Sequence, residues 1–118
     1  MTTILIVDDD PRFRAQACAV LAADGFVVIG EAVDGASGIE AAQALQPDFV
    51  LLDIGLPDIE GFEVATALAL DGPPPLIVLT SSRDARAYGR RLANGQFLGF
   101  IPKERISGPA IRALVDRP

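Results

Sequence analysis

Five short apolar runs alternate along the chain with segments whose apolar residues recur every three or four positions. The runs have the length of single strands, and most are continuously hydrophobic, which is typical of strands covered on both faces. They occupy residues 4–7, 26–29, 49–52, 76–79 and 97–101. The segments with helical spacing carry their apolar residues within 13–21, 39–45, 62–69, 85–92 and 111–115. The pattern therefore predicts five strands that alternate with five helices.

Strict alternation of strands and helices is typical of a doubly wound α/β fold. Right-handed crossovers place helices on both faces of a parallel sheet, and ligands bind beyond the carboxyl ends of the strands. We therefore predict a five-stranded doubly wound parallel sheet of the flavodoxin-like type, with strand order 2-1-3-4-5 and five helices. Asp10 and Pro11 favour a helix start at that point, and Gly25 favours the end of the same helix.

Length and hydropathy limit the number of domains and the cellular setting. The 118 residues suit one domain, so we expect a single domain over 1–118 with no appended output domain. The apolar runs are too short to cross a bilayer, and the N-terminus lacks the basic start of a secretory signal. We therefore predict a cytoplasmic protein that does not associate with a membrane.

The charge and the rare residue types exclude several function classes. A net charge of −6 disfavours direct nucleic-acid binding, and we interpret the only arginine cluster as a solvated helix face. That cluster comprises Arg83, Arg86, Arg90 and Arg91. The absence of histidine excludes a Ser-His triad and a His-rich metal site, so Asp and Glu must carry any metal chemistry. The lone Cys18 is interpreted as a buried apolar side chain.

Acidic residues follow two of the predicted strands directly. Asp8 and Asp9 come after the first strand, and Asp53 comes after the third. These strands are neighbours at the switch point of such a sheet, so the three carboxylates can converge in one cleft. Close carboxylates repel one another, and a cation relieves that repulsion. We therefore predict a site for Mg²⁺ or Mn²⁺ that keeps room for a phosphate oxygen.

Two further side chains complete a candidate phosphoryl site. Thr80 ends the fourth strand and can offer a hydroxyl to a phosphoryl oxygen, and Lys103 follows the fifth strand with an ammonium group. A carboxylate nucleophile that attacks phosphorus forms an acyl phosphate, and positive charge neutralises the transferring group. The set predicts that Asp53 can be phosphorylated.

Four segments together resemble the signatures of the response-regulator receiver domain of two-component systems. They are ILIVDDD at 4–10, LLDIGLPDIEG at 51–61, LTS at 79–81 and GFIPK at 99–103. Each segment is weak alone, but their order and their positions at strand ends are specific, and the resemblance covers essentially the whole chain. It implies a signalling domain rather than an enzyme, one that accepts a phosphoryl group from a sensor histidine kinase or a phosphotransfer protein.

The resemblance also implies a role for each matching position. Asp53 is then the phosphoacceptor, Asp9 a direct metal ligand and Asp8 a ligand through water, with the Gly55 carbonyl as a further metal ligand. Lys103 would pair with the phosphoryl group. Thr80 and Phe100 would be the switch residues, whose coupled movement reshapes the surface of the fourth helix, fifth strand and fifth helix. A receiver homodimer is a further partner that this surface could support.

The chain also departs from the common pattern of that family. Glu104 stands where many members have proline after the lysine, so a cis peptide bond is not expected there. The stretch 95–99 is one residue longer than usual, which favours a bulge or an altered loop. Gly55 and Ser82 are both small, and they predict an open phosphorylation site.

Other function classes remain as alternatives. Asp8 and Asp10 suit an aspartate-nucleophile phosphatase of the haloacid dehalogenase type, but Arg12 stands where that family has Thr or Val, and the chain is short. A pseudo-receiver that binds partners without phosphorylation is a second alternative. Residues 107–110 resemble receivers that precede helix-turn-helix domains, so the chain is either a free-standing receiver or part of a longer regulator. No G-x-G-x-x-G follows a strand, which excludes a dinucleotide site.

Overall fold

A parallel sheet of five strands lies at the centre of the structure, a computed structural model that describes residues 1–70, 72–92 and 97–116. The strand order is β2-β1-β3-β4-β5, and every neighbouring pair is parallel, so the predicted fold class and strand order are confirmed. The strands are β1 (Thr3–Val7), β2 (Val27–Ala32), β3 (Phe49–Asp53), β4 (Leu76–Ser81) and β5 (Gly99–Pro102).

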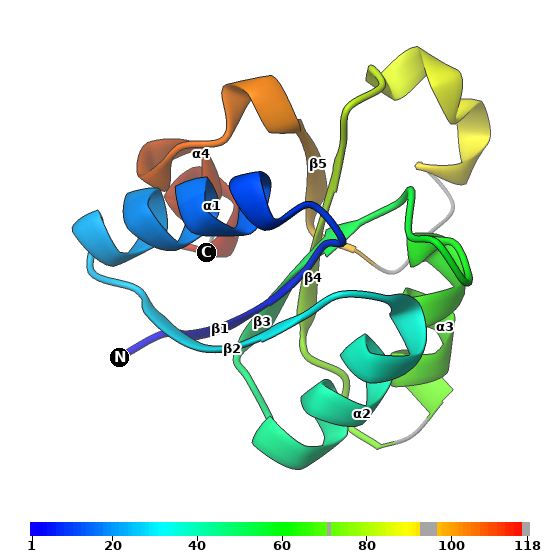
Figure 1. Cartoon of the computed structure of the whole chain (residues 1–118), viewed down its shortest axis with the longest axis horizontal. Helices are drawn as coiled ribbons and strands as arrows, with labels where there is room; N and C mark the ends of the chain where they lie inside the picture. The colour runs from blue at the N-terminus through cyan, green and yellow to red at the C-terminus, as the bar shows by residue number, and fades with distance from the viewer. Residues whose placement is uncertain (71, 93–96, 117–118) are drawn as a thin grey trace.

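Helices cover both faces of this sheet (Figure 1). On one face lie α1 (Pro11–Ala23) and α4 (Gly108–Val115), and on the other lie α2 (Gly35–Leu45) and α3 (Gly61–Leu70). The predicted ends of the first helix are confirmed, because Asp10 caps its start by accepting from Arg12 N, and Gly25 follows it with a φ of 88°. Within the described residues, no helix is long and apolar enough to span a membrane.

The continuous hydrophobic runs supply two separate cores. Successive side chains of a strand point to opposite faces. Ile4 and Ile6 of β1 therefore join the cluster beneath α1 and α4, whereas Leu5 and Val7 join the cluster beneath α2 and α3. All four side chains are fully buried. A strand in this position needs apolar residues at every site, which explains why its sequence lacks alternation.

The predicted helix at 85–92 is wrong over the described residues. Two single turns of 3-10 helix stand there instead, η1 (Ala85–Ala87) and η2 (Gly89–Arg91). Gly89 between them has a φ of 54°, in the left-handed region that an α-helix cannot contain. The described residues therefore hold four α-helices rather than five. The arginine cluster is likewise not one helix face, because Arg83 precedes η1, Arg86 lies in η1, and Arg90 and Arg91 lie in η2.

The irregular points of the sheet differ from those expected. A register shift lies between Ile4 and Leu5, where β1 pairs with β2. Of the stretch predicted to carry a bulge, residues 95 and 96 lie outside the described residues, and Gly99 onward pairs with β4 in continuous register. Among the described residues there is no cis peptide bond, in line with the expectation for the bond between Lys103 and Glu104.

Asp58 caps the start of α2 from a distant part of the chain. Its two carboxylate oxygens accept hydrogen bonds from Gly35 N at 2.7 Å and Ala36 N at 2.9 Å. These bonds stabilise the charged carboxylate and lower the pKa of Asp58 below its ordinary value of 3.8. The loop after β3 is thereby tied to the first turn of α2.

This cap predicts a pH-dependent contribution to stability. A carboxyl group whose pKa is lower in the folded state stabilises above its unfolded pKa and loses that contribution as the pH falls. The wild-type protein should therefore lose more stability than Asp58→Asn as the pH drops below 3.8, the ordinary aspartate value. Urea unfolding at a series of pH values measures this difference. Parallel curves for the two proteins would contradict the capping role.

Candidate functional site

Three carboxylates meet at the carboxyl edge of the sheet. Asp8 and Asp9 follow β1 directly, and Asp53 is the last residue of β3, the strand that pairs with β1. One carboxylate oxygen from each residue lies within 4.8 Å of the other two. Asp8 and Asp53 are only 1% and 4% exposed, whereas Asp9 is exposed. The predicted convergence of these carboxylates is therefore present in the structure.

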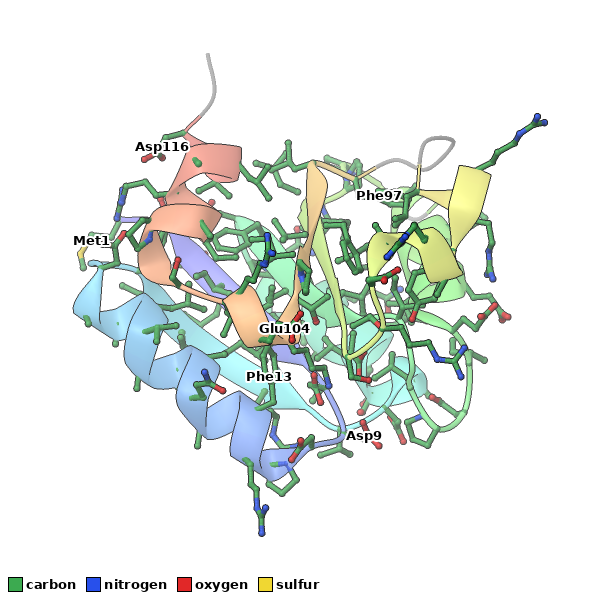
Figure 2. The ribbon with its side chains drawn as sticks, turned by 90° about the horizontal axis from the view of Figure 1, so that it is seen from above. Met1, Asp9, Phe13, Phe97, Glu104 and Asp116 are labelled. Carbon is green, nitrogen blue, oxygen red and sulfur yellow. The ribbon has the colours of Figure 1, made fainter. Side chains whose placement is uncertain are left out.

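Lys103 brings a positive charge to the same place. It begins η3 (Lys103–Arg105), immediately after β5. Its Nζ lies 2.8 Å from Asp8 Oδ2, as an ion pair rather than a well-directed hydrogen bond, and 3.2 Å from Asp53 Oδ2. The ammonium also lies 4.9 Å from the ring centroid of Phe13 on α1, a cation-π contact. Figure 2 shows Asp9 and Phe13 at this edge of the molecule.

Burial and charge act in opposite directions on these groups. Burial raises the pKa of Asp8 and outweighs the contacts with Lys103 and the Asp10 amide, while the charge of Asp53 raises it further. For Lys103, burial favours the neutral amine, but the contacts with Asp8 and Asp53 exceed this effect and raise its pKa. The ammonium therefore stays charged, and it offsets part of the repulsion between two buried carboxylates.

Thr80 and Ser81 end β4 next to the acidic cluster. Thr80 pairs in register with Asp53 and is fully buried, and its hydroxyl oxygen has no hydrogen-bond partner among the described residues. Ser81 does have partners, since its hydroxyl lies 2.5 Å from the Tyr88 hydroxyl and accepts from Arg83 N. A buried hydroxyl without a partner costs free energy, so Thr80 is a donor that a bound group could satisfy.

Phe100 lies on β5 within a group of four aromatic side chains. The centroid of the Tyr88 ring lies 6.1 Å from that of Phe100 and 5.9 Å from that of Phe62, and the centroids of Phe97 and Phe62 are 5.8 Å apart. The guanidinium carbon of Arg91 lies 4.2 Å from the centroid of the Phe62 ring, and Arg91 also forms an ion pair with Glu60. The turns at 85–91 are thus held against α3 and the sheet by aromatic packing, by the hydroxyl contact of Tyr88 with Ser81, and by the contacts of Arg91. Sequence reasoning missed Tyr88, because its spacing indicated only a helix face.

The loop after β3 approaches Asp53 with small residues. Gly55 N donates a hydrogen bond to Asp53 Oδ1 at 3.1 Å, and Gly55 and Ser82 are both exposed. Gly61 N donates a hydrogen bond to the Ile54 carbonyl oxygen at 2.9 Å and so closes this loop at the start of α3. The Gly55 carbonyl as a metal ligand, and an open path to Asp53, stay predictions.

The donor set fits a small hard cation. Carboxylate oxygens are the ligands that Mg²⁺ and Mn²⁺ prefer, and three of them gather here. Two of the carboxylates are buried, and the single ammonium beside them leaves the cluster with excess negative charge. Asp8, Asp9 and Asp53 could therefore hold such an ion without rearrangement of the sheet.

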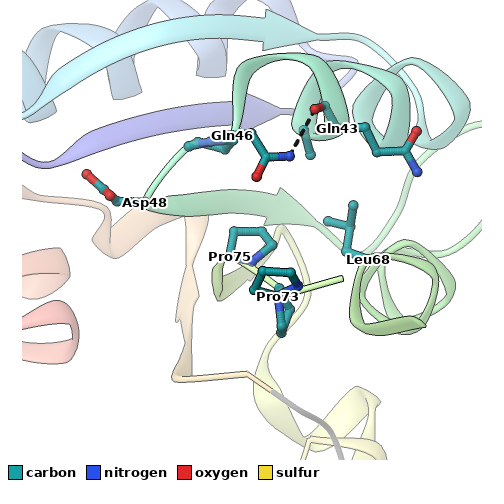
Figure 3. A pocket seen from close by; sticks show the side chains of 9 residues that line it. Gln43, Gln46, Asp48, Leu68, Pro73 and Pro75 are labelled. Carbon is teal, nitrogen blue, oxygen red and sulfur yellow. Dashed lines mark hydrogen bonds between the residues drawn. The ribbon is translucent and has the colours of Figure 1, made fainter. Parts of the chain in front are cut away.

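A second concave region lies at the opposite edge of the sheet (Figure 3). Its lining comes from the end of α2, the connection that leads to β3, Leu68 and the prolines at 73–75. The one carboxylate there, Asp48, accepts hydrogen bonds from Thr3 N and the Thr3 hydroxyl. Because that carboxylate is already engaged, the acidic cluster at the carboxyl edge is the better candidate for chemistry.

Comparison with known proteins identifies the family. The sequence pattern of the response regulator receiver domain matches residues 4–115, nearly the whole chain. The chain belongs to the response regulator receiver family. This receiver is 41% identical over 120 residues to the DNA-binding response regulator MtrA of Mycolicibacterium smegmatis, covering 97% of the chain and 50% of MtrA.

A solved structure extends this comparison. The signal receiver domain of NarL from Mycobacterium tuberculosis superposes with a TM-score of 0.88 at 31% identity, covering 98% of this chain and 94% of that one. In the full-length NarL sequence, the match is 32% identical over 114 residues and covers 96% of this chain and 53% of NarL. The receiver thus spans about half the length of the curated relatives it matches.

Proposed function

We propose that this receiver is a phosphoacceptor of a two-component system and that Asp53 accepts the phosphoryl group. The observation that carries the proposal is the convergence of Asp8, Asp9 and Asp53 with Lys103, beside the unpartnered hydroxyl of Thr80. The donor is a sensor histidine kinase or a phosphotransfer protein. The chain acts as a signalling domain rather than an enzyme, and it does so in the cytoplasm.

In the proposed transfer, an Asp53 oxygen attacks the phosphorus of a phosphohistidine. A bond forms between that oxygen and phosphorus, the bond between phosphorus and the imidazole nitrogen breaks, and its electron pair returns to the imidazole. Lys103 exchanges its contact with the Asp53 carboxylate for a phosphoryl oxygen, and Thr80 donates its hydroxyl to another. Asp8, Asp9 and Asp53, with the Gly55 carbonyl, would hold a divalent cation, which would supply positive charge to the transferring group.

The proposed output is a change of the surface around β4 and β5. Movement of the Thr80 hydroxyl toward a phosphoryl oxygen would free space beside Phe100. The ring of Phe100 packs against the ring of Tyr88. The turns at 85–91 would then change their contact with partners, which include a second receiver in a homodimer. The net charge of −6 disfavours binding of nucleic acid by this chain, because the phosphate backbone is also negative. Any DNA binding would belong to a further domain or to a partner.

Intact-mass measurement after incubation with acetyl phosphate tests the proposal. We expect a gain of about 80 Da, one phosphoryl group, in the presence of Mg²⁺. The gain should be absent with EDTA and in an Asp53→Asn variant. If wild type shows no gain and beryllofluoride leaves its NMR spectrum unchanged, phosphorylation at Asp53 is refuted. The alternative of a receiver that binds partners without phosphorylation would then take its place.

A further inference from the structure

Arg14 of α1 reaches back to the connection that carries the acidic residues. Its Nη1 donates a hydrogen bond to the backbone carbonyl of Asp8 at 2.8 Å, and its Nε contacts Glu31 Oε1 on β2 at 3.1 Å. The side chain of Arg14 is only 17% exposed. One planar guanidinium therefore ties the end of β1 to β2 through two of its donors.

The carbonyl that Arg14 holds belongs to the peptide unit between Asp8 and Asp9. The rest of Asp8 is also fixed, because its amide donates to Ala32 O at 3.0 Å and its Oδ1 accepts from Asp10 N at 2.8 Å. The exposed carboxylate of Asp9, in contrast, has no hydrogen bond or ion pair with any residue that the structure describes. Its position depends on the backbone on either side of it.

We propose that Arg14 is a positioning residue for the divalent cation site. By holding the Asp8–Asp9 peptide against β2, it keeps the Asp9 carboxylate within reach of Asp8 and Asp53. This inference rests on the proposed function, since the cation is the same. It adds a residue from outside the acidic cluster to the residues on which cation affinity depends.

The charge of Arg14 makes the proposal sharply testable. A guanidinium near a cation site repels the cation, so its removal would tighten binding if charge were its only effect. Loss of a residue that orients metal ligands instead weakens binding, typically by 10- to 100-fold. The two interpretations of Arg14 therefore predict opposite signs for the same variant.

Mn²⁺ affinity, measured from the electron paramagnetic resonance signal of the free ion, distinguishes them. We expect Arg14→Ala to weaken Mn²⁺ binding by about tenfold. Arg12→Ala is the matched control, because Arg12 lies on the first turn of α1, is exposed, and its side chain makes no hydrogen bond or ion pair with any residue the structure describes. It removes the same charge and should leave affinity unchanged or slightly tighter. High salt should preserve the difference between these variants.

Arg14→Lys keeps the charge and loses the planar pair of donors, so its affinity should lie between wild type and Arg14→Ala. It also replaces Arg14→Ala if that variant does not fold, as judged by thermal unfolding in EDTA. Affinity equal to wild type in Arg14→Lys, or equal to Arg12→Ala in Arg14→Ala, overturns the role of Arg14. Failure of the wild type itself to bind Mn²⁺ would instead refute the metal-dependent part of the proposed function.

Discussion

Replacing Lys103 with methionine is expected to lower the free energy of unfolding by about 3 kcal/mol when EDTA removes divalent cations. Asp8 and Asp53 are 1% and 4% exposed, and the Lys103 ammonium lies 2.8 and 3.2 Å from their oxygens. Without that ammonium, two buried carboxylates face each other with no compensating charge. Methionine has a similar length and still packs against Phe13, so the loss reports charge more than volume.

Urea unfolding followed by circular dichroism measures this effect. Excess Mg²⁺ should stabilise Lys103→Met more than wild type, because the ion restores the missing positive charge and does not compete with an ammonium. An Asp53→Asn, Lys103→Met double variant is the control, and it should recover much of the lost stability in EDTA. Equal stability of wild type and Lys103→Met in EDTA would contradict the charge balance described for this site.

The acidic cluster could be predicted from the sequence for a simple geometric reason. In a parallel sheet, all carboxyl ends lie at one edge, so residues that follow strand ends converge whatever the intervening sequence. Asp8, Asp53, Thr80 and Lys103 each end or follow a strand, and the structure brings them together. Their chemical roles stay predictions, because the positions of these side chains do not by themselves show which reaction they take part in.

The segment at 85–92 could not be predicted in the same way. Ala85, Tyr88 and Leu92 have helical spacing, yet tertiary contacts decide its conformation. The Tyr88 hydroxyl meets Ser81, and its ring packs against Phe62 and Phe100. Gly89 adopts a positive φ that allows the chain to change direction between the turns η1 and η2. Periodicity describes one face of an element and carries no information on such partners.

Residues that support the site also lie beyond the reach of sequence patterns. Phe13 is the first apolar residue of the first predicted helix, and it is buried, but its ring also faces the Lys103 ammonium. Arg14 and Asp58 are polar residues near helix starts, where solvent exposure is the ordinary expectation. Their hydrogen bonds to Asp8 and to Gly35 join segments that only the folded chain brings together.

Gly61→Ala is the second change for which we expect a large effect, a loss of about 3 kcal/mol in the free energy of unfolding. A Cβ atom at Gly61 would lie 2.5 Å from the Asp53 carbonyl oxygen and 2.9 Å from the Ile54 Cα. Both atoms belong to the backbone of β3 and its exit, so neither can turn aside as a side chain could. The clash must be relieved by moving α3 or the loop, and either shift breaks the 2.9 Å hydrogen bond from Gly61 N to Ile54 O.

Gly55→Ala in the same loop separates this clash from a general effect of added volume. The nearest atom to a Cβ at Gly55 is Asp53 Oδ1 at 3.9 Å, which is ordinary contact, so its stability should stay within about 0.5 kcal/mol of wild type. Urea unfolding of both variants in EDTA gives the comparison without a contribution from bound metal. If Gly61→Ala is as stable as Gly55→Ala, α3 does not start as close to Asp53 as the structure has it. A large loss at Gly61 alone would mean that α3 packs directly on the backbone that presents the candidate phosphoacceptor, so the position of Asp53 depends on a residue with no chemical role.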